Sequence, residues 1–377
     1  MTERPDAGTK NRDRRGQATW PQALAGSLRR DVIRSAGLAA AILLAALAAT
    51  GCSDHRETAA PESAGIAAQL ASLKTMIAQS PDTVTASTPE LRAYRNHYGL
   101  NVAAAEYDFD TLSIAGETVT FQRFEPPEPK ATILIAHGYL DHGGLWRFAI
   151  EDFLTASYAV AVFDFPGHGL STGKPADIDD FGTYLQTLSR ADARAHEVMP
   201  QPVHLVGHSL GGGIVAQYIL ENGLEPPRRA ALIAPNIRSS HWFLTRFGHT
   251  LADPFLDNAP RMNRDVSHNE TFLDFRANRD PLQAGRTPMN WFDQLAEWET
   301  RMQSLPPVQA DVRIIQGTAD RITDWEYNLA FLRNKLPGVD VVMIKGGKHQ
   351  LINESPSLRG QTFFWSRRHL SAAEPSG

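Results

Sequence analysis

The chain contains one cysteine, Cys52, so an intramolecular disulfide bond is excluded. The body of the chain has no run of lysine and arginine, and the formal net charge is −5, so no nucleic-acid partner is predicted. The sequence also lacks the ligand spacing of a metal site and a phosphate-binding glycine loop. We therefore predict neither a metal nor a cofactor.

The N-terminal region has the composition of an export signal. A basic stretch precedes Ala36–Thr50, fifteen residues without a charge, whereas a bilayer-spanning helix needs about 20. This run suits the apolar part of a signal peptide. It ends in Ala49-Thr50-Gly51-Cys52, which resembles the lipobox of bacterial lipoproteins, with Ala49 in place of the usual leucine. Residues 1–51 are interpreted as a signal peptide and Cys52 as the lipidated first residue of the mature chain.

That resemblance implies an exported lipoprotein held at the membrane on the periplasmic side, and Ser53 weakly favours the outer membrane. The alternative is a cleaved or membrane-anchoring signal in which the cysteine is incidental. Residues 28–34 also resemble a degenerate twin-arginine signal, so the export route and the true start codon stay open.

The rest of the chain divides into a tether, a core and an insertion. Residues 52–103 are interpreted as a tether with one amphipathic packing helix, because residues 53–90 are rich in Ala, Ser, Thr and Pro. Its apolar positions are Ile66, Leu70, Leu73 and Ile77. Residues 104–235 and 309–370 alternate strand-like and helix-like segments, and residues 236–308 interrupt that alternation.

The core segments predict a doubly wound, mostly parallel α/β sheet. Several of the strand-like runs are continuously apolar, as expected for strands buried on both faces. The predicted strands are Thr118–Phe124, Ala131–Ala136, Ala159–Phe165, Val203–Val206, Ala230–Ala234, Val312–Gln316 and Val339–Ile344. The predicted helices are Leu145–Ala156, Ile178–Val198, Leu210–Asn222 and Asp324–Leu336.

Residues 236–308 are too long for a simple connection, and they are rich in aromatic side chains. An irregular surface excursion would expose these side chains to water at a cost. We therefore predict an inserted helical lid. Its aromatic residues are Trp242, Phe243, Phe247, Phe255, Phe272, Phe275, Trp291, Phe292 and Trp298.

Ser209 is the candidate nucleophile because it is the serine of a Gly-x-Ser-x-Gly pattern between a predicted strand and a predicted helix. A serine on such a sharp turn needs small residues two positions before and after it. The turn projects the hydroxyl from the carboxyl edge of the sheet, where open α/β sheets bind ligands. An ordinary glycine-rich turn is the alternative, and the flanking strand and helix argue against it.

His349 is the candidate general base, because a serine hydroxyl is a poor nucleophile until a base removes its proton. It follows the last predicted strand in Gly346-Gly347-Lys348-His349, at the same sheet edge as Ser209. His208 is adjacent to the serine and is expected to point away from it, and His204 lies within a strand.

Asp320 is the candidate acid that orients the histidine, because it follows the strand Val312–Gln316 in a glycine-containing turn. Asp324 is the rival, although it is also placed to cap the next helix. The order serine, aspartate, histidine is the one associated with this strand–turn–helix motif.

An oxyanion hole needs two backbone N–H donors near the nucleophile. One is expected from Leu210, directly after Ser209. The other is expected from Tyr139, in the turn His137-Gly138-Tyr139-Leu140 after the strand Ala131–Ala136. A plain strand-ending turn is the alternative for the second segment.

Taken together, the motifs resemble the α/β-hydrolase superfamily, and within it the monoacylglycerol lipase and lysophospholipase group of serine aminopeptidase-like hydrolases. The resemblance covers about residues 105–368. In chain order the matching segments are His137–Tyr139, Asp164–Ser171, Gly207–Gly212, Gly317–Asp320 and Gly347–His349. In that group the insertion forms a lid over an acyl-chain pocket, and Asp164–Ser171 is expected to shape a loop behind the site, with His168 structural.

The resemblance implies a serine carboxylic-ester hydrolase that acts on monoacyl lipids through an acyl-enzyme, with a small acyl ester as its substrate. An acyltransferase or peptidase with the same triad is an alternative. A non-catalytic binding protein is a second alternative, but binding alone requires neither the histidine nor the aspartate.

Lipidation of Cys52 is testable by cell fractionation. Cys52→Ala removes the only thiol that a lipid could modify, so we expect the variant in the soluble fraction while the wild type sediments with membranes. Unchanged membrane association of the variant would contradict lipidation.

Overall fold

The computed structural model describes residues 61–103, 105–240, 258–260 and 265–371. The chain separates into two compact units, residues 1–52 and 53–377, and every described residue belongs to the second. The predicted signal peptide and Cys52 therefore lie outside the described residues. In the described part of the chain, no helix has the length and apolar character needed to cross a membrane.

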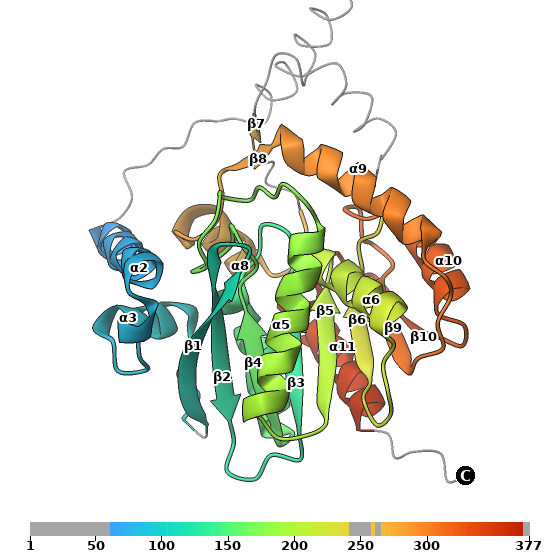
Figure 1. Cartoon of the computed structure of the whole chain (residues 1–377), viewed down its shortest axis with the longest axis horizontal. Helices are drawn as coiled ribbons and strands as arrows, with labels where there is room; N and C mark the ends of the chain where they lie inside the picture. Colours follow the sequence, from blue (N-terminus) through green and yellow to red (C-terminus); the bar gives the residue numbers. More distant parts are fainter. Residues whose placement is uncertain (1–60, 104, 241–257, 261–264, 372–377) are drawn as a thin grey trace, which may run out of the picture. The chain divides into compact units, whose positions relative to one another are not determined.

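An eight-stranded sheet forms the centre of the second unit, with strand order β1-β2-β4-β3-β5-β6-β9-β10 (Figure 1). From β4 to β10 all neighbours are parallel, whereas β2 is antiparallel to both β1 and β4. The strands are β1 (Glu106–Ile114), β2 (Glu117–Glu125), β3 (Ala131–Ala136), β4 (Tyr158–Phe163), β5 (Val203–His208), β6 (Ala230–Ile233), β9 (Val312–Gly317) and β10 (Asp340–Ile344).

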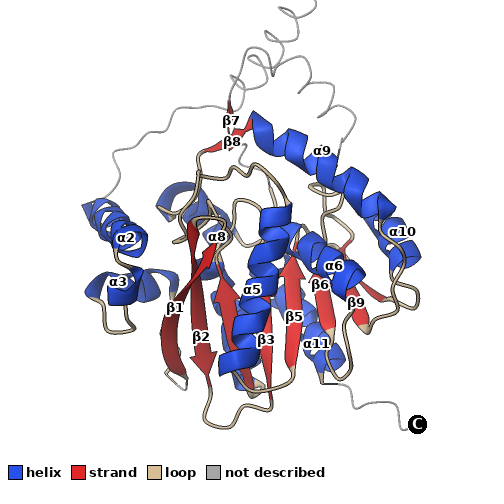
Figure 2. Ribbon diagram, in the orientation of Figure 1, coloured by secondary structure: helices blue, strands red, loops and turns tan. Residues whose placement is uncertain are grey.

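Helices cover both faces of this sheet, because the central strands are apolar on both sides. Every residue of β3, β4, β5 and β6 is buried. The hydrophobic cluster on one face includes α5 (Gly182–Val198), α6 (Leu210–Asn222), α9 (Met289–Ser304) and α10 (Trp325–Lys335). The cluster on the other face includes α2 (Pro61–Gln79), α3 (Pro89–Tyr98), α4 (Arg147–Thr155) and α11 (Pro356–Leu370). In Figure 2, α5 and α6 lie in front of the sheet and α11 lies behind it.

The prediction of a doubly wound, mostly parallel sheet is confirmed, and each of the seven predicted strands is present. Strand β1, an edge strand that begins with alternating acidic and apolar residues, was not predicted. A signal for it exists in the two-residue turn Ala115-Gly116, which has positive φ at both positions and joins β1 to β2 as a tight hairpin. Helices α3 and α11 were also not predicted.

The described part of residues 236–308 contains the short helix α8 (Glu270–Asp274) and the longer helix α9. It also contains a small antiparallel pair, β7 (Asn258–Pro260) and β8 (Arg286–Pro288), which was not predicted. Four of the aromatic residues assigned to the lid, Trp242, Phe243, Phe247 and Phe255, lie outside the described residues.

The amphipathic segment expected in the tether forms α2. Its apolar residues Leu70, Leu73 and Ile77 are buried against the core, and the ammonium of Lys74 donates to the carbonyl oxygen of Gly169 at 2.9 Å. The predicted tether is thus joined to the α/β core by both apolar packing and a hydrogen bond.

This packing predicts a stability change for Leu73→Ala. The side chain is 0% exposed, so truncation leaves a cavity and should cost about 2–5 kcal/mol of unfolding free energy. Gln69 is exposed on the same helix, so Gln69→Ala should change the unfolding free energy by less than about 0.5 kcal/mol. Denaturant unfolding measures both, and equal stability of the two variants would show that α2 does not pack on the core in solution.

Candidate active site

Ser209 occupies the single position between β5 and α6, in a backbone conformation with φ 53° and ψ −118°. Positive φ is strained for a residue with a side chain. The flanking glycines make the turn possible. A Cβ on Gly207 would lie 2.5 Å from the carbonyl oxygen of Gly211, and one on Gly211 would collide with the carbonyl of Ala136. The predicted turn is therefore present, and its two glycines are sterically required.

The structure brings Ser209, His349 and Asp320 together from three separate loops. His349 Nε2 lies 3.0 Å from Ser209 Oγ, and His349 Nδ1 lies 2.9 Å from Asp320 Oδ2. Because the carboxylate accepts, the neutral imidazole donates from Nδ1 and accepts the serine proton at Nε2. Asp320 follows β9 and His349 follows β10, so both approach from the same sheet edge as the serine.

Asp320 is held as a carboxylate in a buried position. Burial acts to raise its pKa, but the facing His349 and donated hydrogen bonds outweigh it, and the pKa is well below its usual range. The donors are Gln316 Nε2 at 3.1 Å, Ile322 N–H at 2.8 Å, and the Thr323 hydroxyl at 2.8 Å. The aspartate is thus fixed in place and remains able to stabilise a positive imidazolium.

The rival carboxylate, Asp324, has a different position. It is the N-cap residue of α10, and its side chain accepts from the Tyr327 N–H at 3.3 Å. This is the capping geometry that the sequence analysis considered for it. Asp320, and not Asp324, contacts the histidine.

The two expected oxyanion donors flank the serine. Leu210 is the first residue of α6, so its N–H has no acceptor within the helix. The loop after β3 approaches from the other side, where a Cβ on Gly138 would lie 3.1 Å from Ser209 Cβ. Neither the Leu210 N–H nor the Tyr139 N–H has a hydrogen-bond partner in the portion of the chain that the structure describes.

His137 orients the peptide that carries the Tyr139 N–H, a role that the sequence analysis did not assign. Its Nδ1 donates to the Gly138 carbonyl oxygen at 2.8 Å, and its Nε2 accepts from the Phe165 N–H at 2.9 Å. Burial lowers the pKa of His137 to about 3, so the ring is neutral, as this donor–acceptor pair requires. Because C=O and N–H point to opposite sides of a trans peptide, holding the carbonyl also fixes the direction of the Tyr139 N–H.

The expectation that His208 points away from the site is only half right. Alternation along β5 does send its side chain to the opposite face from Leu205. The chain that follows His349 packs on that same face, however, and His208 Nε2 donates to the His349 carbonyl oxygen at 3.0 Å. Burial lowers the pKa of His208 to about 3, so it supports the His349 loop as a neutral donor.

The Asp164–Ser171 segment shapes a loop beside the site, as the resemblance implied. The buried Asp164 carboxylate accepts from the Gly143 N–H at 2.7 Å and from the Leu170 N–H at 2.8 Å. His168 is buried, and its Nδ1 donates to the Pro166 carbonyl oxygen at 3.0 Å. These bonds join the loop after β4 to the loop after β3, which carries Tyr139.

Two of the tryptophans predicted for the lid hold α9 on the core. The Trp291 ring stacks on Tyr139 with 3.7 Å between ring centroids, and Trp298 Nε1 donates to Gln217 Oε1 at 2.6 Å. Both tryptophans are buried. Helix α9 is therefore packed directly against the loop that carries the Tyr139 N–H.

A buried polar cluster connects the loop after β3 to the insertion, and the sequence analysis missed it. His142 Nε2 lies 3.1 Å from Asp280 Oδ2, and the Tyr98 hydroxyl donates to Asp280 Oδ1 at 2.6 Å. Burial raises the pKa of nearby Asp141 to about 6. No sequence signal pairs residues 138 positions apart.

In the residues described, no group of three or more His, Cys, Asp or Glu side chains could hold a metal ion.

The lowered pKa of Asp320 predicts a pH-dependent stability. A carboxyl whose pKa is lower in the folded state stabilises the fold above its unfolded pKa of about 3.9, and this contribution is lost as the pH falls through the folded value. The unfolding free energy of the wild type should therefore fall relative to that of Asp320→Asn as the pH drops below about 4. A constant difference between the two from pH 7 to pH 3 would contradict the assigned environment.

Comparisons with known proteins identify the family that the chain resembles. The family model for the serine aminopeptidases S33 matches residues 127–356. Human monoglyceride lipase is 28% identical over 271 residues, which cover 68% of this chain and 88% of the lipase. A phospholipase of Bacillus subtilis is 24% identical over 208 residues, covering 52% of this chain and 78% of that enzyme.

Among solved structures, a soluble variant of the Saccharomyces cerevisiae monoglyceride lipase, in complex with a substrate analog, has a TM-score of 0.60. Its sequence identity is 14%, and the match covers 72% of this chain and 96% of the yeast chain, so it supports the fold alone. The family match spans more than half of the chain and includes all three residues of the serine–histidine–aspartate arrangement. The chain therefore belongs to the serine aminopeptidase S33 family of α/β-hydrolases, and it is a serine hydrolase of the lipase and esterase type.

Proposed function

We propose that this chain hydrolyses the carboxylic ester of monoacyl lipids through an acyl-enzyme on Ser209. The observation that carries the proposal is the hydrogen-bonded series from Ser209 Oγ to His349 Nε2, and from His349 Nδ1 to Asp320, at 3.0 and 2.9 Å. The series starts at a serine that a strained turn presents at the sheet edge.

The chemistry follows from the positions of these atoms. Ser209 Oγ attacks the ester carbonyl carbon while its proton passes to His349 Nε2, and Asp320 stabilises the resulting imidazolium. The carbonyl oxygen becomes an oxyanion that accepts from the N–H groups of Leu210 and Tyr139. Collapse of this intermediate expels the alcohol, which takes the proton from His349. Water then attacks the acyl-enzyme by the same steps and releases the fatty acid.

A monoacyl lipid is the proposed substrate because two observations favour an apolar acyl chain. Human monoglyceride lipase is similar over most of its length. In the described part of the insertion, residues 236–308, Trp291 lies beside the loop after β3, where its ring stacks on Tyr139. We propose that this insertion forms the lid over the acyl chain. The similarity to a phospholipase makes a lysophospholipid the second candidate, because it differs from a monoacylglycerol only in its phosphate-bearing head group.

The proposed location follows from the N-terminal sequence alone. Cleavage before Cys52 and lipidation of its thiol would leave the hydrolase exported and anchored at a membrane surface, on the periplasmic side. A lipid substrate is concentrated at such a surface.

A substrate panel tests the proposal. Wild type, Ser209→Ala and the exposed control Ser357→Ala are compared on monoacylglycerols, lysophospholipids, peptide amides and p-nitrophenyl esters of increasing chain length. Because removal of a nucleophilic serine disables the whole triad, Ser209→Ala should lower kcat by at least about 10⁴-fold, while Ser357→Ala is unaffected. Turnover should rise from acetyl to longer esters.

Activity retained by Ser209→Ala would show that another group is the nucleophile. A sharp preference for acetyl esters or for peptide amides would contradict the lipid substrate but would leave the serine chemistry intact.

A further inference from the structure

The loop that carries His349 has little regular structure of its own. It begins after β10 ends at Ile344 and reaches only a short 3₁₀ turn at Leu351–Asn353. The imidazole must nevertheless remain at hydrogen-bond distance from both Ser209 and Asp320. Its position therefore depends on contacts that other segments make with the loop backbone.

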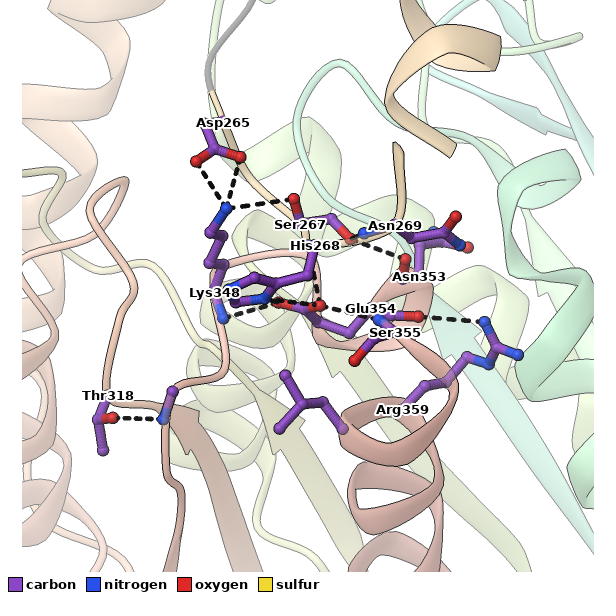
Figure 3. A network of polar contacts seen from close by, with 12 residues as sticks. Asp265, Ser267, His268, Asn269, Thr318, Lys348, Asn353, Glu354, Ser355 and Arg359 are labelled. Atoms are coloured by element: carbon purple, nitrogen blue, oxygen red, sulfur yellow. Dashed lines mark hydrogen bonds and ion pairs between the residues drawn. The ribbon is translucent and has the colours of Figure 1, made fainter. Parts of the chain in front are cut away.

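A buried carboxylate, Glu354, makes the central contact of this kind (Figure 3). Its side chain is 0% exposed, and its oxygens accept from the N–H groups of Lys348 at 2.9 Å, His268 at 3.0 Å and Ser355 at 2.8 Å. The His268 ring nitrogen Nδ1 lies 2.9 Å from the same carboxylate. One side chain thus holds the residue before His349 and a segment of the insertion.

That segment is residues 265–269, which we call the strap. Its Val266 carbonyl oxygen accepts from the Gln350 N–H at 2.9 Å, and its Ser267 hydroxyl donates to the Asn353 carbonyl oxygen at 2.9 Å. The Lys348 ammonium donates to Asp265 Oδ1 at 2.6 Å. In Figure 3 the strap runs alongside the loop from Lys348 to Ser355, and the network joins them at several points.

Hydrogen bonds therefore hold the residues on both sides of His349 in the chain. The Lys348 N–H is bonded to Glu354, the Gln350 N–H is bonded to the strap, and the His349 carbonyl oxygen is bonded to His208. Burial acts to raise the pKa of Glu354, but the N–H groups of His268, Lys348 and Ser355 outweigh it, and the pKa is below its usual range. The acceptor is an ionised carboxylate, with both oxygens engaged by backbone N–H groups.

We propose that Glu354 is a positioning residue for the general base: it fixes the His349 loop against the strap and so makes the imidazole geometry depend on the docking of the insertion. The proposal rests on the proposed role of His349. It assigns to Glu354 no contact with the substrate or with the reacting atoms.

Glu354→Gln tests the proposal at nearly constant volume. One carboxylate oxygen becomes an NH₂ group, which cannot accept a hydrogen bond from a backbone N–H. The variant therefore loses either the bond from Lys348 or the two bonds from His268 and Ser355. A displacement of about 1 Å in a catalytic group costs on the order of 10²-fold. We expect kcat to fall by about 10- to 100-fold with KM nearly unchanged, and the rate of Ser209 labelling by a fluorophosphonate to fall by the same factor.

The matched control is Glu270→Gln, an exposed glutamate next to the strap, which should retain wild-type rates. Two readouts separate positioning from general stability. These are the kcat-against-KM split at a temperature where the variant is folded, and the rate of Ser209 labelling under the same conditions. A folded variant that is only less stable retains the wild-type values of both.

Glu354→Asp is the second test variant, to be used if Glu354→Gln does not fold. It keeps the charge but shortens the side chain by one methylene, so kcat should still fall at constant KM. Wild-type kcat and Ser209 labelling rate in whichever variant is folded would overturn the proposal. The wild type reports separately on the proposed function: absence of labelling at Ser209 refutes the serine mechanism, whereas wild-type labelling rates in a folded Glu354 variant refute only the positioning role.

Discussion

The strained turn at Ser209 is the constraint on which the rest of the site depends. A residue with a side chain is held at φ 53° where a parallel strand meets a helix, and it can be held there only because Gly207 and Gly211 leave room for neighbouring backbone. The strain is sustained by a core in which the strand before the turn is buried throughout. The consequence is a hydroxyl at the sheet edge, with the N–H of Leu210, the first residue of α6, beside it.

The other groups reach that hydroxyl because of the sheet topology. Strands β3, β5, β9 and β10 are parallel members of one sheet, so the loops that follow them emerge at one edge. Those loops carry Tyr139, Ser209, Asp320 and His349. Their fine positions come from buried polar side chains behind them: His137 orients one peptide, His208 holds the His349 carbonyl, and Glu354 holds the residue before it.

Much of this arrangement could be predicted from the sequence, because the signals are local. The apolar runs of the central strands and the glycines around Ser209 each lie within a few residues of the feature that they specify. Asp320 was predicted with Asp324 as its rival, because both follow the same strand, and the hydrogen bonds in the structure separate them. Glu354 contacts His268, which is 86 positions away, and His142 contacts Asp280, which is 138 positions away. No local sequence pattern indicates contacts at such separations. Edge strand β1 was missed although acidic and apolar residues alternate at its start, because aspartate is uncommon in strands.

We propose that the Ser209 hydroxyl faces a base on one side and two backbone donors on the other. A crystal structure of the protein inhibited by an alkyl phosphonate tests it directly, because the tetrahedral phosphorus mimics the intermediate of ester hydrolysis. We expect phosphorus bonded to Ser209 Oγ, with one phosphonyl oxygen within hydrogen-bond distance of both the Leu210 and Tyr139 N–H groups. An adduct on a different residue, or a phosphonyl oxygen directed away from these two groups, would contradict it.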